Sequence, residues 1–222
     1  MSNAAGFPHK HLIEKYASLG YTFKPEDIVT SRRAMALSVG DGAGLKWGLV
    51  VSDGISVAEF ERLDHIRLRE DPADYEISER VLMIGSATWT ESRQAMLEAS
   101  LSNVPRPVYV GNPDIVAPRE KGFSIEPGYF AHRLADRTGI VPEFFGKPFR
   151  NIYEIAFAQL KPEISRDRVL MVGDSLHTDV LGSHVAGIRS ALVTDHGFLA
   201  GRDVKADIER TGLVPDFILP SP

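Results

Sequence analysis

Short apolar runs alternate with amphipathic stretches along this chain, and this alternation predicts a protein of the α/β class. The first amphipathic stretch covers residues 9–19, where four apolar side chains share one helical stripe. The stripe consists of Leu12, Ile13, Tyr16 and Leu19. Gly20 follows, in a position where glycine commonly ends a helix. After a turn, a second helical stretch is predicted around residues 33–37.

Between residues 44 and 135 the apolar runs are short and separated by turn residues, which predicts an α/β unit of its own. The strand-like runs are WGLVVSDG, ERVLMIGSA and RPVYVGNPD, at residues 47–54, 79–87 and 106–114. A helical stretch, TESRQAMLEASLS, lies between the last two runs.

From residue 138 onward, predicted strands alternate with predicted helices, which favours a doubly wound parallel sheet. The strands are predicted at residues 168–172, 189–195 and 216–219, and the clearest helices at 151–160 and 176–187. We therefore predict a core built from residues 1–37 and 138–222. Residues 38–137 are predicted to form an α/β cap domain inserted into that core.

Composition and charge exclude some classes of function, although they do not identify one. Apolar residues make up 43% of the 222 residues and the net charge is −5, so a buried core is expected and a basic surface for nucleic acid is not. The chain has neither an apolar run of the roughly 18 residues that span a bilayer nor a leader-like start, which predicts a cytoplasmic protein without a membrane partner. With no cysteine, any metal must be held by oxygen or imidazole.

The segment RVLMVGDSLHTDVLGSHVAGI, residues 168–188, carries the clearest chemical signal. Asp174 directly follows a predicted strand, and ligands of doubly wound sheets bind outside the carboxyl ends of the strands. Mg²⁺ is commonly bound by one or two carboxylates and several waters, so Asp174 and Asp179 are predicted metal residues. The alternative is that Asp174 only caps the following helix.

Lys147, between Gly146 and Pro148, is the second candidate because a lysine held on a short loop can present a point charge to a phosphate. The alternative for an isolated lysine is a solvated surface charge.

Several segments, in order, resemble the haloacid dehalogenase (HAD) superfamily of phosphohydrolases. GDSLHTDVLGSHVAGI resembles its fourth motif, GKP with Lys147 its third, and Ser2-Asn3 with the later LGYTFKPEDIVTS its second motif and sequel. YVGNPD and EPGYFAHRLADRTG are similar to the end of the cap sheet and the helix that returns to the core. The resemblance is to phosphatases with a large inserted α/β cap, of the p-nitrophenylphosphatase or phosphoglycolate phosphatase kind.

This resemblance implies a Mg²⁺-dependent phosphatase that hydrolyses a small phosphate monoester through an aspartyl-phosphate. Ser2 and Lys147 would hold the phosphoryl oxygens, with Asn3 beside Ser2. Asp174 would bind Mg²⁺, with Asp179 supporting it. Two further residues, Asn112 and Asp114, would either shape the substrate entrance or form an ordinary Asn-Pro-Asp turn.

The chain departs from the family pattern at the nucleophile, the first aspartate of a D-x-D-G motif that should precede Ser2. The nearest match is Val51-Ser52-Asp53-Gly54, and Val51 cannot be phosphorylated. In a rearranged interpretation, this run would replace the first motif and Ser86 would replace the second-motif serine.

We expect instead that a segment with the first core strand and both catalytic aspartates is missing before Ser2, so that this chain alone is inactive. Ser2-Asn3 is then native sequence rather than the remnant of a cleaved tag, which is the other possibility. The second hypothesis is a non-catalytic phosphate- or metal-binding remnant, or a module that forms a homodimer through the cap.

Overall fold

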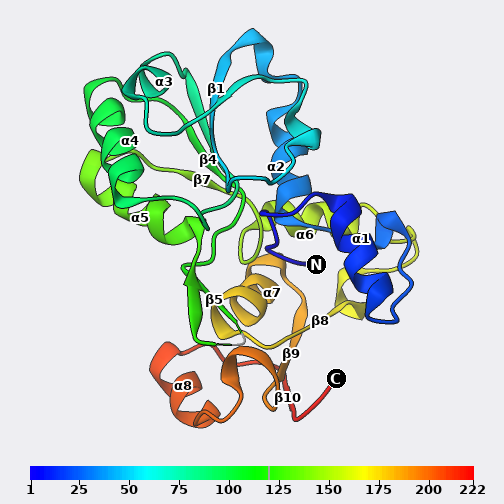
Figure 1. The fold of residues 1–222 in the computed structure, drawn as a ribbon. Coiled ribbons are helices and arrows are strands. Elements are labelled where there is room, and N and C mark those ends of the chain that lie inside the picture. Colours follow the sequence, from blue (N-terminus) through cyan, green and yellow to red (C-terminus); the bar gives the residue numbers. More distant parts are fainter. Residues whose placement is uncertain (120) are drawn as a thin grey trace. The chain divides into compact units, whose positions relative to one another are not determined.

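The computed structural model describes residues 1–119 and 121–222, which form two compact units, Met1–Gly146 and Lys147–Pro222 (Figure 1). Each unit has its own parallel sheet, which confirms the predicted α/β class. The boundary between the two compact units falls after Gly146. The assignment of residues 1–37 and 138–222 to one core, with 38–137 as a cap, stays a prediction.

The first unit is built on a five-stranded sheet in the order β2-β1-β3-β4-β7, in which every neighbouring pair is parallel. The strands are β1 (Lys46–Val50), β2 (Asp64–Arg67), β3 (Arg80–Met83), β4 (Val108–Val110) and β7 (Glu143–Phe144). Val50 pairs with Met83, and Met83 with Val110. The residues that follow these strands therefore meet at one edge of the sheet.

Helices α3 (Pro72–Glu76), α4 (Glu91–Asn103) and α5 (Pro127–Thr138) pack against this sheet, with α4 and α5 side by side (Figure 1). Thr90 caps α4, because its side chain accepts a hydrogen bond from the Arg93 N–H. Apolar residues of the strands and these helices form the buried core of this unit: Val50, Leu68, Tyr75, Val81, Met83, Trp89, Leu97, Leu101, Val108, Val110, Phe130, Ala131 and Leu134.

The N-terminal residues join this unit through helices α1 (His9–Ser18) and α2 (Ser31–Val39), which confirm the two helices predicted there. Ser2 forms a parallel bridge with Thr30: its N–H donates to Val29 O at 2.9 Å, and its carbonyl accepts from the Ser31 N–H at 3.0 Å. Short 3-10 turns η1 (Pro25–Asp27) and η2 (Gly42–Gly44) complete this segment, and a third, η3 (Ala58–Phe60), lies between β1 and β2.

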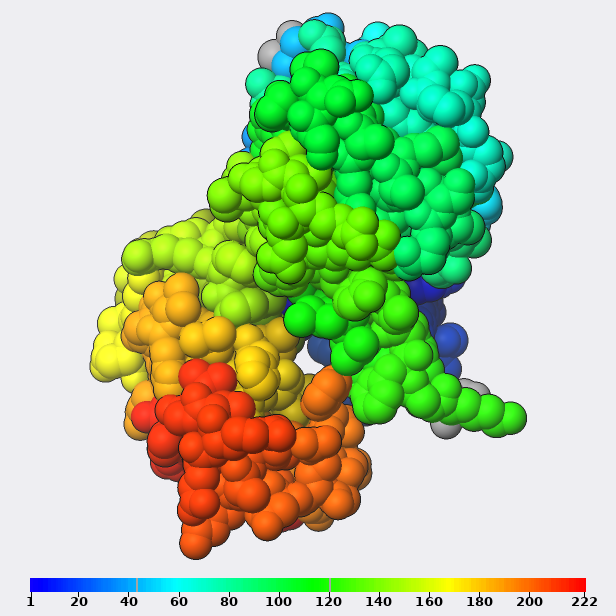
Figure 2. Space-filling model, turned by 90° about the vertical axis from the view of Figure 1, so that its left-hand side faces the viewer, coloured from blue at the N-terminus to red at the C-terminus, as the bar shows by residue number. Residues whose placement is uncertain are grey.

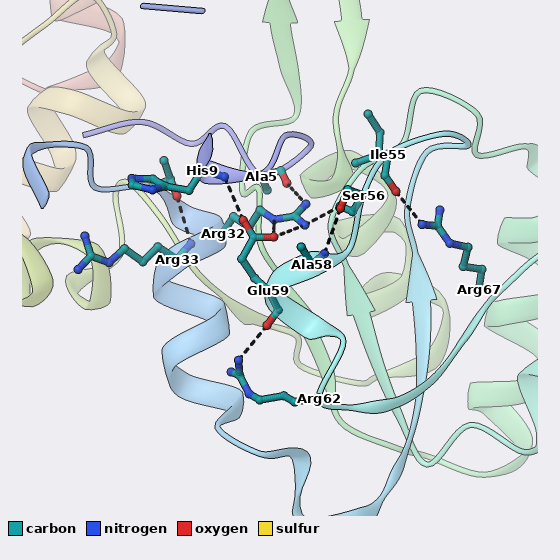
Figure 3. A network of polar contacts seen from close by, with 11 residues as sticks. Ala5, His9, Arg32, Arg33, Ile55, Ser56, Ala58, Glu59, Arg62 and Arg67 are labelled. Carbon is teal, nitrogen blue, oxygen red and sulfur yellow. Dashed lines mark hydrogen bonds and ion pairs between the residues drawn. The ribbon is translucent and has the colours of Figure 1, made fainter. Parts of the chain in front are cut away.

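Arg32 of α2 is the centre of a buried polar network in the first unit (Figure 3). Its guanidinium donates to the Glu59 carboxylate at 2.6 and 3.0 Å, to Ala5 O at 3.1 Å and to Ser56 O at 2.7 Å. The other oxygen of Glu59 accepts the His9 N–H at 3.0 Å. The network thus joins Ala5 and His9, shortly after Asn3, to α2 and η3.

The sequence pattern missed a two-stranded antiparallel hairpin formed by β5 (Val116–Pro118) and β6 (Phe123–Ile125). The hairpin, green in Figure 2, stands out from the rest of its unit. Phe123 and Ile125 are 64% and 50% exposed. The pattern also missed β2, whose residues DHIR are at most half-buried and show no apolar alternation.

The second unit contains a three-stranded parallel sheet in the order β10-β9-β8, with β8 at an edge of the described sheet. Its strands are β8 (Leu170–Gly173), β9 (Arg189–Val193) and β10 (Phe217–Leu219), and its helices are α6 (Arg150–Phe157), α7 (Leu181–Ala186) and α8 (Val204–Thr211). A π-helix, η5 (Leu176–Val180), precedes α7, and 3-10 turns η4 (Arg166–Arg168) and η6 (Gly197–Leu199) lie before β8 and after β9.

The predicted strands at 168–172, 189–195 and 216–219 are therefore confirmed to within two residues at each end. The expectation that a first core strand is missing stays a prediction. Among the described residues, no helix is both long enough and apolar enough to cross a membrane.

Replacing Arg32 by methionine should destabilise the first unit by about 3–5 kcal/mol, because the substitution leaves Glu59 without its buried partner. Both tryptophans, Trp47 and Trp89, lie in this unit, so tryptophan fluorescence during urea unfolding measures its stability. The control is Arg69→Met, which breaks the exposed Arg69–Asp53 pair and should cost less than about 1 kcal/mol. Equal losses in the two variants would contradict the role given to Arg32.

The same network predicts a loss of stability in acid. Burial alone would raise the pKa of Glu59, but hydrogen bonds from the His9 N–H and Arg32 and the charge of Arg32 lower it below its ordinary value of 4.5. A carboxylate with a lowered folded-state pKa stabilises the fold above its unfolded pKa, and this contribution is lost as pH falls through the folded value. Glu59→Gln should therefore flatten the fall in unfolding free energy below pH 4.5.

The measurement is urea unfolding, followed by tryptophan fluorescence, at a series of acidic pH values. Glu61→Gln, at an exposed neighbouring position, is the control and should retain the wild-type slope. A wild-type slope in Glu59→Gln would show that this carboxylate does not contribute to acid sensitivity.

Candidate active site

Asp179 organises the loop that follows β8. Its side chain is 4% exposed, and Oδ2 accepts the N–H groups of Asp174 and Ser175, both at 3.1 Å. Its other oxygen, Oδ1, accepts from Lys147 Nζ at 2.5 Å. Both oxygens of this carboxylate are therefore occupied by donors from the chain itself.

The loop can close on Asp179 because residue 173 is glycine. A Cβ added at Gly173 would lie 2.2 Å from Cγ of Asp179, closer than any real contact. Leu176 and Val180, the first and last residues of the π-helix that carries Asp179, are buried with Leu192 and Leu199. Local backbone geometry and apolar packing thus hold the Asp179 carboxylate under the end of β8.

The ion pair with Asp179 places Lys147 beside the predicted metal loop, although 32 positions separate the two residues. The Lys147 side chain is 14% exposed. The alternative interpretation, a solvated surface lysine, is therefore wrong for this residue.

Tyr153 of α6 is buried in the same unit, and an added Cβ at Gly182 would lie 2.1 Å from its hydroxyl oxygen. Burial, followed by the charge of Asp179, raises the pKa of Tyr153. Its phenol is thus protonated at neutral pH and packs as a neutral group against Gly182 of α7.

Asp174 has a different environment from Asp179. Its Oδ2 accepts the Phe198 N–H at 2.9 Å, and Phe198 belongs to η6, which follows the neighbouring strand β9. Oδ1 accepts no hydrogen bond from the described part of the chain. The residue before the π-helix is Ser175, and no side chain caps that helix. Asp174 therefore does not act as the helix cap that was the alternative to a metal ligand.

The donor set fits Mg²⁺ through one carboxylate rather than two. Within residues 1–119 and 121–222, no group of three or more His, Asp or Glu side chains is arranged to hold a metal. Asp174 is half-buried and keeps one oxygen available, whereas Asp179 has both oxygens engaged. Since Mg²⁺ often takes only one or two protein carboxylates and fills its other positions with water and phosphate oxygens, Asp174 is the residue that would hold this ion directly.

Ser2 and Asn3 lie in the first unit, where Asn3 contacts one of the predicted cap residues. Asn3 is 7% exposed, and its Nδ2 donates to Asp114 Oδ1 at 2.8 Å. Ser2 Oγ accepts the Ala4 N–H at 3.2 Å. A Cβ added at Gly146 would lie 2.6 Å from Asn3 Oδ1, so the residue before Lys147 also packs closely on Asn3.

Asn112 takes part in the turn that follows β4. Its Oδ1 accepts the Asp114 N–H at 3.0 Å and its Nδ2 donates to Glu126 Oε2 at 3.0 Å. Gly128, in the first turn of α5, donates its N–H to Asp114 O at 3.1 Å, and an added Cβ there would lie 2.1 Å from Pro113 O. Asn112 thus supports the turn and the start of α5, in agreement with the turn interpretation of Asn-Pro-Asp.

The rearranged interpretation gains no support from the contacts of its residues. Val51 is buried after β1, and Asp53 forms a half-exposed ion pair with Arg69 at 3.2 Å. Ser86 Oγ donates to Ile125 O at 2.9 Å. These side chains have structural partners, and none of the contacts joins Asp53 to Ser86.

Sequence reasoning missed the Gly197–Phe198 turn that contacts Asp174. The available signal was a glycine shortly after the predicted strand 189–195. Its left-handed backbone, with φ of +70°, and the hydrogen bond from Phe198 are visible only in the structure.

Comparisons with known proteins find similarity to phosphatases. Residues 144–221 match a family model described as HAD-hydrolase-like. An acid sugar phosphatase from Staphylococcus haemolyticus is 27% identical over 191 residues, covering 81% of this chain and 65% of that protein. The chain thus spans about two thirds of the length of this curated relative. An acid sugar phosphatase from Staphylococcus aureus is 25% identical over 237 residues, covering 97% of this chain and 82% of that protein.

Solved structures share the fold across almost the whole chain. A protein described as a possible sugar phosphatase of the HAD superfamily, from Cytophaga hutchinsonii, has a TM-score of 0.85 at 24% identity, covering 99% of this chain and 80% of that one. A p-nitrophenyl phosphatase from Archaeoglobus fulgidus has a TM-score of 0.80 at 23% identity, covering 99% and 81%. The matched residues 144–221 contain Lys147, Asp174 and Asp179, so the part of the chain that carries these candidates is similar to the HAD-hydrolase-like family.

Proposed function

We propose that this chain is part of a phosphatase that hydrolyses a small phosphate monoester, with sugar phosphates as the first substrate class to test. The observation that carries the proposal is the loop after β8, where Asp179 holds Lys147 and the backbone of Asp174 and Ser175. The names of the relatives, acid sugar phosphatase and p-nitrophenyl phosphatase, support the reaction and suggest the substrate class.

The proposed chemistry follows from the charges in the second unit. The Lys147 ammonium, held by Asp179 at 2.5 Å, would stabilise the negative charge on the phosphoryl oxygens. Asp174 would hold Mg²⁺ through the oxygen that accepts no hydrogen bond from the described residues. Mg²⁺ bound there would neutralise developing charge on the transferred phosphoryl group.

The nucleophile of the proposed reaction would lie outside these 222 residues. They contain no D-x-D-G segment, and the proposed aspartyl-phosphate needs the first aspartate of that motif. We therefore expect the chain alone to be inactive. The role of Ser2 in holding a phosphoryl oxygen, with Asn3 beside it, belongs to the same proposal, as does a homodimer formed through residues 38–137.

The competing candidate is a non-catalytic phosphate- or metal-binding remnant, favoured by the absence of D-x-D-G from these residues. The experiment uses this chain and a version extended upstream of Met1 in its genomic reading frame. Both are assayed with p-nitrophenyl phosphate and a panel of sugar phosphates, with Mg²⁺ and with EDTA.

The extended protein should be active with Mg²⁺ and lose activity with EDTA, and the 222-residue chain should be inactive. In the extended protein, Asp174→Asn and Lys147→Met should each lower kcat about 100-fold or more, because each removes charge stabilisation of the transition state. Asp167→Asn and Lys161→Met, at exposed positions of the same unit, are the matched controls and should retain activity.

An extended protein that hydrolyses none of these esters would overturn the enzyme proposal in favour of the binding remnant. Activity of the 222-residue chain that Asp174→Asn abolishes would instead show that a nucleophile lies within these residues.

A further inference from the structure

The Asp174 carboxylate is contacted by a turn that neither the sequence motifs nor the family comparisons assign to the site. Phe198 lies 24 positions after Asp174, and its backbone N–H donates to Oδ2 at 2.9 Å. The turn follows β9, which pairs in parallel with β8, so that Gly173 lies opposite Leu192. Since both strands end at the same edge, the loop after β9 reaches the first residue after β8.

Gly197 makes this contact possible. Its φ of +70° lies in the left-handed region, which is unfavourable for residues that have a Cβ. An added Cβ would lie 1.6 Å from Oδ2 and 2.5 Å from Cγ of Asp174, so the carboxylate occupies the space that a side chain would fill. Any other residue at this position would have to displace the Asp174 carboxylate or the turn.

Leu199 anchors the turn to the rest of the loop. It is 4% exposed and belongs to the apolar cluster that contains Leu176 and Val180 of the π-helix. Asp179, on the same π-helix, accepts the Asp174 N–H. The backbone of Asp174 is therefore fixed from its own loop, and its side chain is fixed from the loop after β9.

The carboxylates of Asp174 and Asp179 thus differ in how many of their oxygens already accept hydrogen bonds. Asp179 accepts three hydrogen bonds over its two oxygens. Asp174 accepts one side-chain hydrogen bond, on Oδ2, from the described residues. One amide donor fixes the orientation of a carboxylate and leaves its second oxygen for a hard cation, which prefers such oxygen ligands.

We propose that Gly197 and the Phe198 N–H are positioning residues that orient the Asp174 carboxylate to bind a divalent cation through Oδ1. This inference rests on the proposed function, because it takes Asp174 as the direct metal ligand. It adds the turn after β9 to the site.

The test uses the 222-residue chain and Mn²⁺, a paramagnetic probe for Mg²⁺ sites, with NMR line broadening of backbone amides as the readout. In the wild type, Mn²⁺ should broaden the amides of residues 174, 175 and 198 first. Gly197→Ala should require at least 10-fold more Mn²⁺ for the same broadening, and Asp174→Asn should abolish the selective broadening.

Gly201→Ala is the matched control. Gly201 also has a left-handed backbone, with φ of +74°, but an added Cβ there would meet nothing within 4 Å. The substitution thus introduces the same kind of backbone strain four residues away without touching Asp174, and its Mn²⁺ requirement should stay within 2-fold of the wild type.

The outcomes separate this inference from the proposed function. Wild-type Mn²⁺ broadening in Asp174→Asn would overturn the metal role of Asp174 and the inference with it. Loss in Asp174→Asn but equal Mn²⁺ requirements in Gly197→Ala and Gly201→Ala would overturn only the positioning role.

Should Gly197→Ala fail to fold, a Mg²⁺ titration of the wild type decides the question. The Phe198 amide resonance should shift with Mg²⁺, and the shift should disappear in Asp174→Asn. A Phe198 resonance that does not respond to Mg²⁺ would overturn the proposal.

Discussion

The candidate site of the second unit depends on the hydrogen bonds and the ion pair of the Asp179 carboxylate. A buried carboxylate is costly unless its charge is paired and its oxygens accept hydrogen bonds. Here two backbone N–H groups and the Lys147 ammonium meet both requirements. The same contacts turn the chain sharply after β8 and bring Lys147 to the loop, so a single side chain determines the positions of two candidate catalytic groups.

Because the chain itself occupies both oxygens of Asp179, the two aspartates of this segment, five residues apart, can have different roles. Asp179 has both oxygens engaged, and Asp174 has one engaged by Phe198. Each carboxylate packs against a glycine. A side chain at Gly173 would occupy the space of Asp179, and a side chain at Gly197 would occupy the space of Asp174. The different hydrogen bonding of these two carboxylates is therefore set by backbone geometry rather than by residue type.

The sequence predicted the parts of the fold and site that depend on local pattern. The strands around 170, 190 and 217 are apolar runs between turn residues, and Asp174 is recognisable because it follows such a run. Lys147 and Asp179 were found separately, but their ion pair joins residues 32 positions apart and required the structure. Strand β2 and the β5–β6 hairpin were missed because these strands have only three or four residues, none of them buried, and such segments are too short for a strand pattern to be recognised.

The contacts of Ser2 and Asn3 bear on whether they are native sequence or a tag remnant. The remnant of a cleaved tag is not expected to make specific contacts with the protein interior, and terminal residues are commonly disordered unless the fold holds them. Ser2 pairs through its backbone with residues 29 and 31, and the buried Asn3 donates to Asp114, 111 positions away. From two residues after Asn3, Arg32 and Glu59 hold the chain at Ala5 and His9 as well. Contacts this specific, to three separate segments, favour Ser2 and Asn3 as native parts of the fold, as the resemblance of this segment to the second HAD motif implies.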